Sequence, residues 1–279
     1  MVKRCKELKF PLRGKYLIML APSFIVDFEY PLIISQLKEL NFDKVVEVTF
    51  GAKMINRDYH RILKNSKELK IATACPGIVD YVCRVYPKYK KSLIKVDSPM
   101  VAMAKVCKKT YPKHKVVFLS PCNFKKIEAG GSKYIDYVIS FKDLKEVLEK
   151  KKIKGRKGNF HFDKFYNDYT KVYPLSGGLT KTAHLKGIVK KKEVKIVDGI
   201  NYIKKFLDKP NKEIKFLDCT FCNGGCIGGP LVNSEESLRA RKEKVVDYFE
   251  SSQDEDIPDS RKGLIEKAKG ISFLKKGFR

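Results

Sequence analysis

Three cysteines stand close together near residue 220 and are followed at once by glycines. They are Cys219, Cys222 and Cys226, in the segment LDCTFCNGGCIGGP that spans residues 217–230. Thiols in such a group can bind zinc, form disulfides or hold an iron–sulfur cluster. The spacing C-x2-C-x3-C does not choose among these chemistries, so the choice depends on the other cysteines and on the elements that position them.

The chain has eight cysteines among 279 residues. We expect a cytoplasmic protein without a membrane span, because Pro22 interrupts the apolar stretch YLIMLAPSFIV and no apolar run approaches the roughly 18 residues that a span needs. A reducing compartment disfavours disulfides and favours thiolate–metal chemistry. Cys5, Cys83 and Cys107 have basic or apolar neighbours and are predicted to act as small hydrophobic residues.

Short apolar runs alternate with helical patterns along the chain. Such runs are typical of buried parallel strands, and the alternation predicts an α/β fold with a doubly wound sheet. The predicted strands are residues 16–21, 44–50, 69–74, 115–120 and 137–140, with two more within 193–200 and 213–219.

We expect two lobes, each with a mostly parallel sheet flanked by helices, and an active site in the cleft between them. Residues 149–168 have weak periodicity and resemble a linker. The predicted units are a first α/β lobe at 1–150, a linker at 151–168, a second α/β lobe at 169–230 and a helical basic tail at 231–279. In that tail, Asn233 and Glu236 predict a helix capping box.

Four of the predicted strands end in unusual residues, in the sequences LAPS, ATACPG, LSPCN and LDCTFC. Ligands of open α/β sheets bind beyond the carboxyl ends of the strands. Cys75, Cys122 and the three later cysteines are therefore expected to meet in one crevice. Scattered thiols with one close pair favour an iron–sulfur cubane over structural zinc, although zinc binding and simple packing of buried thiols stay open.

The formal net charge is +27, from 59 Lys and Arg against 32 Asp and Glu. Nucleic-acid binding is one interpretation, but the lysines are scattered and no recognised nucleic-acid module accompanies them. We expect no nucleic-acid partner. A lysine-rich solvated surface and a basic docking face for an acidic redox partner are the remaining interpretations.

Several segments resemble, in order, the catalytic domain of [FeFe]-hydrogenases. The glycine-rich FCNGGCIGGP resembles that family's A-C-P-G-G-C-I-N-G-G-G, and TACPGIVDYV resembles its T-S-C-C-P-G-W segment. The resemblance covers residues from about 15 to 230. The other matching segments are LAPSFIVDF, DSPMVAMAKV, SPCNFKKIEA and PLSGGLTKTA.

The resemblance implies an H-cluster, which is a [4Fe–4S] cubane joined through a cysteine sulfur to a di-iron unit with CO, cyanide and a bridging dithiolate. Lys125 would donate to a cyanide, as an ammonium group can. Cys226 would be the thiolate that bridges to the di-iron unit. The implied cubane ligands are Cys75, Cys122, Cys222 and Cys226, and the other residues expected around the cofactor are Ala21, Pro22, Ser23, Gly177, Gly178 and Thr220.

The chain departs from the family pattern at the positions of the family's proton-transfer residues. Ala74 stands in place of the cysteine that passes protons to the di-iron ligand, and Asp58 is the only acidic residue in the expected relay segment. Cys219 is left without a family role and is either packing or a substitute proton carrier. Further departures expected to line the pocket are Ser120, Thr220 and Met100, with Tyr173 and Pro174 near the family's aromatic residue.

The leading hypothesis is a minimal [FeFe]-hydrogenase that catalyses reversible H2 formation and oxidation, slowed by Ala74. The alternatives are an H2 or redox sensor with the same cluster and low turnover, and a hydrogenase-like iron–sulfur protein without the di-iron unit. No C-x2-C-x2-C run is present, so we expect electrons to come directly from an acidic ferredoxin- or flavodoxin-like donor. The H-cluster would also require di-iron maturation proteins as partners.

Overall fold

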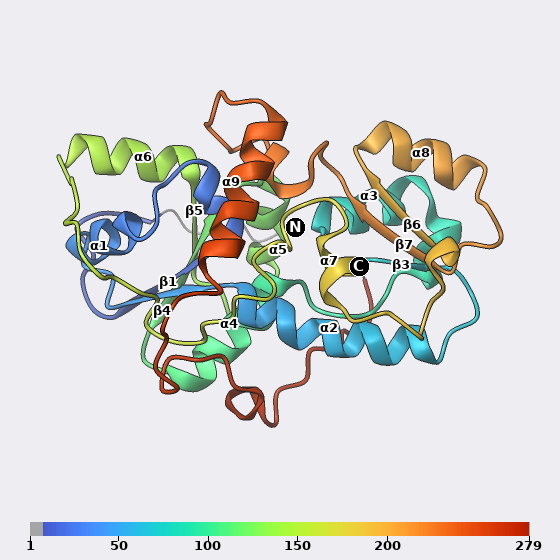
Figure 1. The fold of residues 1–279 in the computed structure, drawn as a ribbon, viewed down its shortest axis with the longest axis horizontal. Helices are drawn as coiled ribbons and strands as arrows, with labels where there is room; N and C mark the ends of the chain where they lie inside the picture. Colours follow the sequence, from blue (N-terminus) through green and yellow to red (C-terminus); the bar gives the residue numbers. More distant parts are fainter. Residues whose placement is uncertain (1–7, 279) are drawn as a thin grey trace.

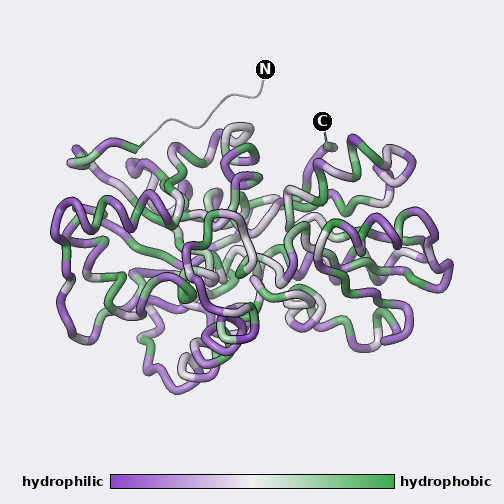
Figure 2. Tube along the Cα trace, turned by 90° about the horizontal axis from the view of Figure 1, so that it is seen from above, coloured by the Kyte–Doolittle hydropathy of each residue, from purple (hydrophilic) through white to green (hydrophobic). Residues whose placement is uncertain are grey.

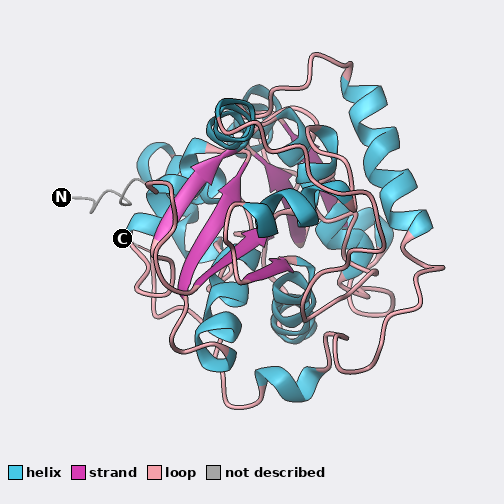
Figure 3. Ribbon diagram, turned by 90° about the vertical axis from the view of Figure 1, so that its left-hand side faces the viewer, coloured by secondary structure: helices cyan, strands magenta, loops and turns pink. Residues whose placement is uncertain are grey.

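Two parallel β-sheets, with helices packed against them, form the protein (Figure 1). The computed structural model describes residues 8–278, so Cys5 lies outside the described residues. Figure 3 shows the strands enclosed by helices, and Figure 2 shows hydrophobic segments in the interior of both halves. The predicted α/β class, with parallel sheets flanked by helices, is confirmed.

The first sheet has the strand order β2-β1-β4-β5. The chain passes from β1 to β2 on one side of the sheet and later from β4 to β5 on the other side. The direction of the strand order therefore reverses between β1 and β4. Such a reversal opens a crevice at the carboxyl ends of the two strands. The strands are β1 (Tyr16–Leu20), β2 (Lys44–Glu47), β4 (Lys115–Ser120) and β5 (Tyr137–Ser140), and the helices between and beside them are α1 (Leu32–Glu39), α2 (Thr49–Lys64), α4 (Pro99–Thr110), α5 (Asn123–Gly130) and α6 (Phe141–Lys150).

The second sheet has the order β3-β7-β6 and is also parallel. Its strands are β3 (Lys70–Ile71), β6 (Val194–Asp198) and β7 (Phe216–Thr220), accompanied by α3 (Pro76–Val85), α7 (Gly178–Thr182) and α8 (Ile200–Asp208). β3 lies within the predicted first lobe but pairs with β7. The two sheets are therefore not two consecutive stretches of chain, and the domain boundaries at 150, 168 and 230 stay predictions.

The helices begin where their sequences provide caps. Ser98 accepts a hydrogen bond from the Val101 N–H at the start of α4, and Ser140 forms a capping box with Asp143 at the start of α6. Helix α7 is short, since it begins at Gly178 and ends at Thr182. In residues 8–278 no helix is both long and apolar enough to cross a bilayer.

The chain beyond residue 230 packs onto the rest of the protein. Its helix α9 (Leu238–Ser251) contacts the 3₁₀ turns at Pro22–Val26 and Gly225–Gly228, and it runs across the middle of Figure 1. The predicted capping box was wrong: Ser237 caps α9, and the Asn233 N–H instead donates to Asp27. Two tight turns therefore lie against the part of the chain that was predicted as a tail.

Candidate metal-cluster site

A cavity lies at the carboxyl ends of strands from both sheets. Segments that follow β1, β2, β3 and β4 reach it, together with the end of β7, as expected for ligand sites in parallel sheets. The predicted site residues that line it are Ala21, Pro22, Ser23, Ala74, Cys75, Met100, Cys122, Lys125, Tyr173, Pro174, Cys219, Thr220 and Cys226.

Four predicted residues do not line the cavity. Ser120 is fully buried, and its hydroxyl donates to the Cys122 carbonyl (2.9 Å) and accepts from the Cys122 N–H (3.1 Å). It therefore holds the backbone of a predicted ligand. Gly177 and Gly178 form the start of α7, where a Cβ on Gly178 would stand 2.4 Å from the Val172 carbonyl oxygen. The fourth residue is Cys222, which is not among the residues that line the cavity.

Neighbouring thiols contribute to the raised pKa values of Cys122, Cys222 and Cys226. Burial raises the pKa of Cys222 to about 12, and the charges of Cys122 and Cys75 add to this shift. Burial also raises the pKa of Cys226, followed by the charges of Cys75, Cys122 and Cys222. Burial is the largest cause of both shifts, and the like charges of the other thiols add to it. Each iron of a cubane takes its own thiolate, so four grouped thiols suit that cluster.

Cys219 has a different environment from the other thiols. Burial raises its pKa, and the next contribution comes from Asp218 and then from Cys75. Its side chain packs in the apolar cluster that contains Ile71 and Leu217, while also bordering the cavity. Across residues 8–278, no three His, Cys, Asp or Glu side chains close on one point as a single metal ion requires.

Two hydroxyl groups in the cavity wall have no hydrogen-bond partner. Ser23 Oγ and Tyr173 Oη are both buried and unpaired within the described structure. Leaving a buried polar atom unsatisfied costs about 1–3 kcal/mol. Their presence on the wall is therefore consistent with a polar group bound in the cavity, as an H-cluster with cyanide and carbonyl ligands would be.

Lys125 is held at the cavity by its own helix. Its Nζ donates to Glu128 Oε2 (2.8 Å) and lies 3.4 Å from the Ala74 carbonyl oxygen. Ser98 Oγ donates to the same carboxylate oxygen (2.8 Å). Burial would raise the pKa of Glu128, but the charges of Lys125 and Lys275 outweigh it and lower the net pKa. The lysine thus stays near the cavity beside a stable carboxylate.

Glycines allow the cysteine loop to approach the rest of the site closely. Gly225 has a φ of +75°, and a Cβ there would lie 2.4 Å from the Pro174 carbonyl oxygen. The neighbouring Cys226 N–H donates to that same oxygen (2.8 Å). Only glycine adopts this conformation without strain in so little space.

Replacing Gly225 by alanine is expected to reduce the free energy of unfolding by about 1–3 kcal/mol, because both the positive φ and the contact with Pro174 are unfavourable. Denaturant unfolding of the cluster-free chain measures this change. Gly131→Ala is the control, since a Cβ there meets nothing closer than 3.5 Å. Equal stability of the two variants would contradict the close approach.

The expected acidic relay does not reach the cavity. Asp58 forms an ion pair with Arg61 (2.8 Å) and lines a separate surface groove with Met54. Tyr59, the next residue of α2, accepts the Thr73 N–H at its Oη (2.7 Å), whereas the residues of α2 that line the cavity are Thr49 and Ala52. Ala74 lines the cavity with a methyl group, which carries no proton.

Sequence reasoning missed one carboxylate of the cavity, Asp218. Its Oδ2 accepts hydrogen bonds from the backbone N–H (2.9 Å) and the hydroxyl (2.7 Å) of Thr180. Burial raises its pKa. A charged residue inside the otherwise apolar strand FLDCT was the available signal.

The buried thiols should make stability depend on pH. A Cys222 pKa near 12 in the folded chain exceeds the ordinary value of 9.0, so the folded state keeps a proton that the unfolded state loses. Stability from this group is complete below pH 9.0 and falls as the pH rises toward 12. We expect denaturant unfolding of the cluster-free chain to show a shallower decline in Cys222→Ser. An identical decline would contradict the thiol's contribution.

Four neighbouring thiols, a cavity-facing lysine and two unpaired hydroxyls define a candidate iron–sulfur site in a parallel α/β protein. The family model described as "Iron only hydrogenase large subunit, C-terminal domain" matches residues 15–230. The chain therefore belongs to this family, as the sequence segments indicated.

Individual relatives are distant. Iron hydrogenase 1 of Clostridium pasteurianum is 25% identical over 81% of this chain and 50% of the relative. The cytosolic Fe-S cluster assembly factor NAR1 of Encephalitozoon cuniculi is 23% identical over 73% of this chain and 63% of the relative. The chain thus spans only part of the length of each relative.

A solved [FeFe]-hydrogenase structure, from a study of oxygen inactivation of the H cluster, superimposes on this chain with a TM-score of 0.71. It is 15% identical, and the match covers 98% of this chain and 96% of that chain. At this identity the similarity concerns the fold.

Proposed function

We propose that this chain is an iron-only hydrogenase that catalyses reversible H2 formation and oxidation in the cytoplasm. Cys75, Cys122, Cys222 and Cys226 would hold the [4Fe–4S] cubane of an H-cluster, and the adjoining cavity would enclose its di-iron unit. The bound cluster would supply the redox-active iron at which electrons and protons combine. Di-iron maturation proteins would deliver the di-iron unit.

One observation carries this proposal. Cys75, Cys122 and Cys226 line a cavity that also presents Lys125 and the unpaired hydroxyls of Ser23 and Tyr173. A cubane needs only the thiolates, whereas anionic or polar diatomic ligands need donors of this kind. Lys125 and Ser23 would orient such ligands, and the apolar wall formed by Phe118 and Leu179 would exclude water.

A second candidate is a hydrogenase-like iron–sulfur protein that lacks the di-iron unit. Similarity to the assembly factor NAR1 favours it, as does Ala74 in place of the proton-passing cysteine. An H2 or redox sensor with a complete cluster but little turnover is the third hypothesis. Ala74 favours that hypothesis as well.

Infrared spectroscopy separates the three hypotheses. The full chain is reconstituted with iron and sulfide and matured with the di-iron precursor, and the CO and cyanide bands are recorded. Bands together with H2 turnover are the expected result. Bands without turnover would favour the sensor, and a cubane without bands would favour the assembly-factor-like protein.

The electron donor is proposed to be an acidic ferredoxin- or flavodoxin-like protein, because the net charge of +27 would speed its encounter. The initial rate of electron transfer from such a donor should fall steeply as salt is added. A rate that does not change with ionic strength would reject electrostatic docking.

A further inference from the structure

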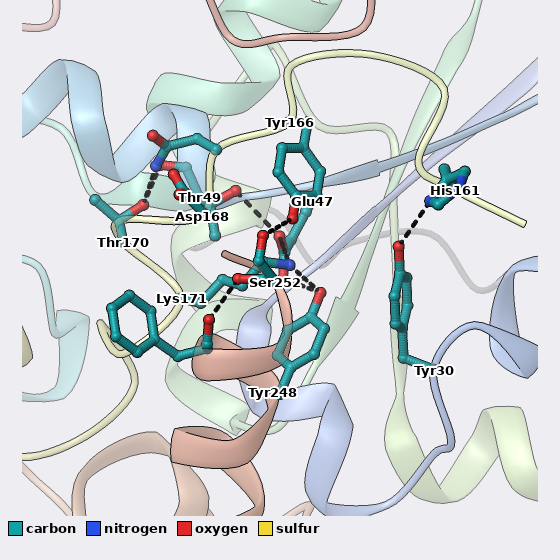
Figure 4. A network of polar contacts seen from close by, with 12 residues as sticks. Tyr30, Glu47, Thr49, His161, Tyr166, Asp168, Thr170, Lys171, Tyr248 and Ser252 are labelled. Carbon is teal, nitrogen blue, oxygen red and sulfur yellow. Dashed lines mark hydrogen bonds and ion pairs between the residues drawn. The ribbon is translucent and has the colours of Figure 1, made fainter. Parts of the chain in front are cut away.

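A fully buried ion pair, formed by Glu47 and Lys171, lies beside Tyr248 of helix α9 (Figure 4). Glu47 is the last residue of β2, and Lys171 Nζ lies 3.2 Å from Glu47 Oε2 with both side chains completely buried. Tyr248 of α9 completes the group: Lys171 Nζ donates to Tyr248 Oη (2.5 Å), which donates to Glu47 Oε1 (2.8 Å). These three groups satisfy one another.

The direction of the hydrogen bonds in this group is fixed. An ammonium group donates only, so Tyr248 Oη accepts from Lys171 and turns its own hydrogen toward Glu47. The ammonium also lies 3.8 Å from the centre of the Tyr248 ring and 5.0 Å from that of Tyr166. The further ionisable groups beside the network are Tyr30 and Glu255.

The network continues to the cavity at one end. Thr49 Oγ1 donates to Glu47 Oε2 (3.2 Å), and Thr49 is one of the residues that line the cavity. This connection arises because β2 ends at Glu47 and α2 begins at Thr49, which places both residues at the carboxyl edge of the sheet.

At the other end, Tyr248 borders the protein surface, while its hydroxyl points inward to Lys171 and Glu47. Tyr248 lines a groove beside α9 together with Asp27, Glu29, Glu236 and Asp247. We call this the α9 groove. Thr49, Glu47 and Tyr248 therefore form a hydrogen-bonded row that begins at the cavity and ends at a residue of the α9 groove.

A buried ion pair needs an explanation other than stability. Replacing such a pair with apolar residues is often neutral or stabilising, because removing two charges from water costs several kcal/mol. Here the pair keeps a carboxylate inside the protein between two hydroxyl groups, all within hydrogen-bond distance. Carboxylate and hydroxyl groups in such a row can each take up a proton on one side and release one on the other.

We propose that Thr49, Glu47 and Tyr248 carry protons between the α9 groove and the central cavity. This inference rests on the proposed function: proton reduction in the cavity needs a supply of protons, and Ala74 provides none. Lys171 acts as a positioning residue that keeps Tyr248 pointed at the carboxylate.

The transfer balances without any other reactant. Tyr248 gives its hydroxyl proton to Glu47 and is reprotonated by a proton that enters from the α9 groove. Glu47, now a carboxylic acid, turns and gives a proton to Thr49 Oγ1 as the Thr49 hydroxyl proton leaves toward the cavity. The net result moves one proton from groove to cavity and restores the carboxylate, and the reverse sequence moves one outward.

Hydrogen–deuterium exchange of a cavity thiol tests the row without a cluster. Cys219 borders the cavity and is 3% exposed, so its S–H group reports proton access. The metal-free full chain is mixed rapidly with D2O, and the conversion of the S–H infrared band to S–D is followed. The band is assigned by its loss in Cys219→Ser.

Thr49→Val should slow this exchange by about tenfold or more, because positioned proton-transfer groups contribute at least that much. Thr49→Ser keeps the hydroxyl and should restore the rate. Tyr248→Phe should slow exchange as well. Tyr166→Phe is the matched control: its hydroxyl donates to the Ser252 carbonyl (2.8 Å) and is no part of the row, so its exchange should match the wild type.

Wild-type exchange in both Thr49→Val and Tyr248→Phe would overturn the proposal, even if both variants melt at lower temperature. Thr49→Ser exchanging as slowly as Thr49→Val would also overturn it. If Tyr248→Phe does not fold, the two Thr49 variants decide alone. If exchange is slow in Thr49→Val and Tyr248→Phe but the matured wild type never shows CO and cyanide bands, the proton row is supported and the proposed function is rejected. If exchange is normal in both variants but the wild type shows those bands, the proton row is rejected and the proposed function is supported.

Discussion

Cys222→Ala is expected to abolish assembly of the [4Fe–4S] cubane, whereas Cys219→Ala retains it. Cys222, Cys75 and Cys122 each raise the pKa of Cys226, so the four thiols form one group. Cys75 also raises the pKa of Cys219, but Cys219 packs in the apolar cluster with Ile71 and Leu217. A cubane needs four thiolates, and losing one removes the ligand of one iron.

Iron content, visible absorption and the electron paramagnetic resonance signal of the reduced cluster measure this outcome after anaerobic reconstitution. Cys219→Ala serves as the matched control, because it removes a neighbouring buried thiol of the same loop region. Cubane retention in Cys222→Ala with loss in Cys219→Ala would replace the ligand set. The set would then be the cysteines on the cavity wall, namely Cys75, Cys122, Cys219 and Cys226.

The main elements of the fold could be predicted because buried parallel strands have continuous apolar sequences. The predicted ends were less accurate where the chain turns toward the site. Residues 69–74 were expected to form a strand, but β3 ends at Ile71 and the Thr73 N–H donates to Tyr59 Oη instead of to a strand. Likewise, Thr49 begins α2 rather than extending β2.

The convergence of Cys75, Cys122 and Cys226 on one cavity could also be predicted, because the carboxyl ends of parallel strands share an edge. The contact between Glu47 and Tyr248 could not. These residues are separated by 201 positions, and the sequence gives no pattern that brings α9 against β2. The polar sequence of α9 also predicts a solvated tail, although Val245 and Tyr248 on one face of this helix are buried.

Lys125→Ala is expected to leave the cubane in place and to prevent stable incorporation of the di-iron unit. The Lys125 ammonium is the positively charged group of the cavity wall, where it would donate to an anionic ligand. CO and cyanide infrared bands should weaken strongly, and H2 turnover should fall on the order of a hundredfold or more, as when a preorganised donor is removed. The cubane signal in paramagnetic resonance should persist.

Lys126→Ala is the matched control, since the neighbouring side chain is 39% exposed and lies 3.7 Å from Asp143. Lys125→Arg adds a second comparison: it keeps the charge beside Glu128 but changes the donor geometry. If charge compensation of Glu128 were the only role of Lys125, the arginine variant would retain the bands at full strength. Full bands in Lys125→Ala would contradict any contact between this lysine and the di-iron unit, and would favour a protein that holds the cubane alone.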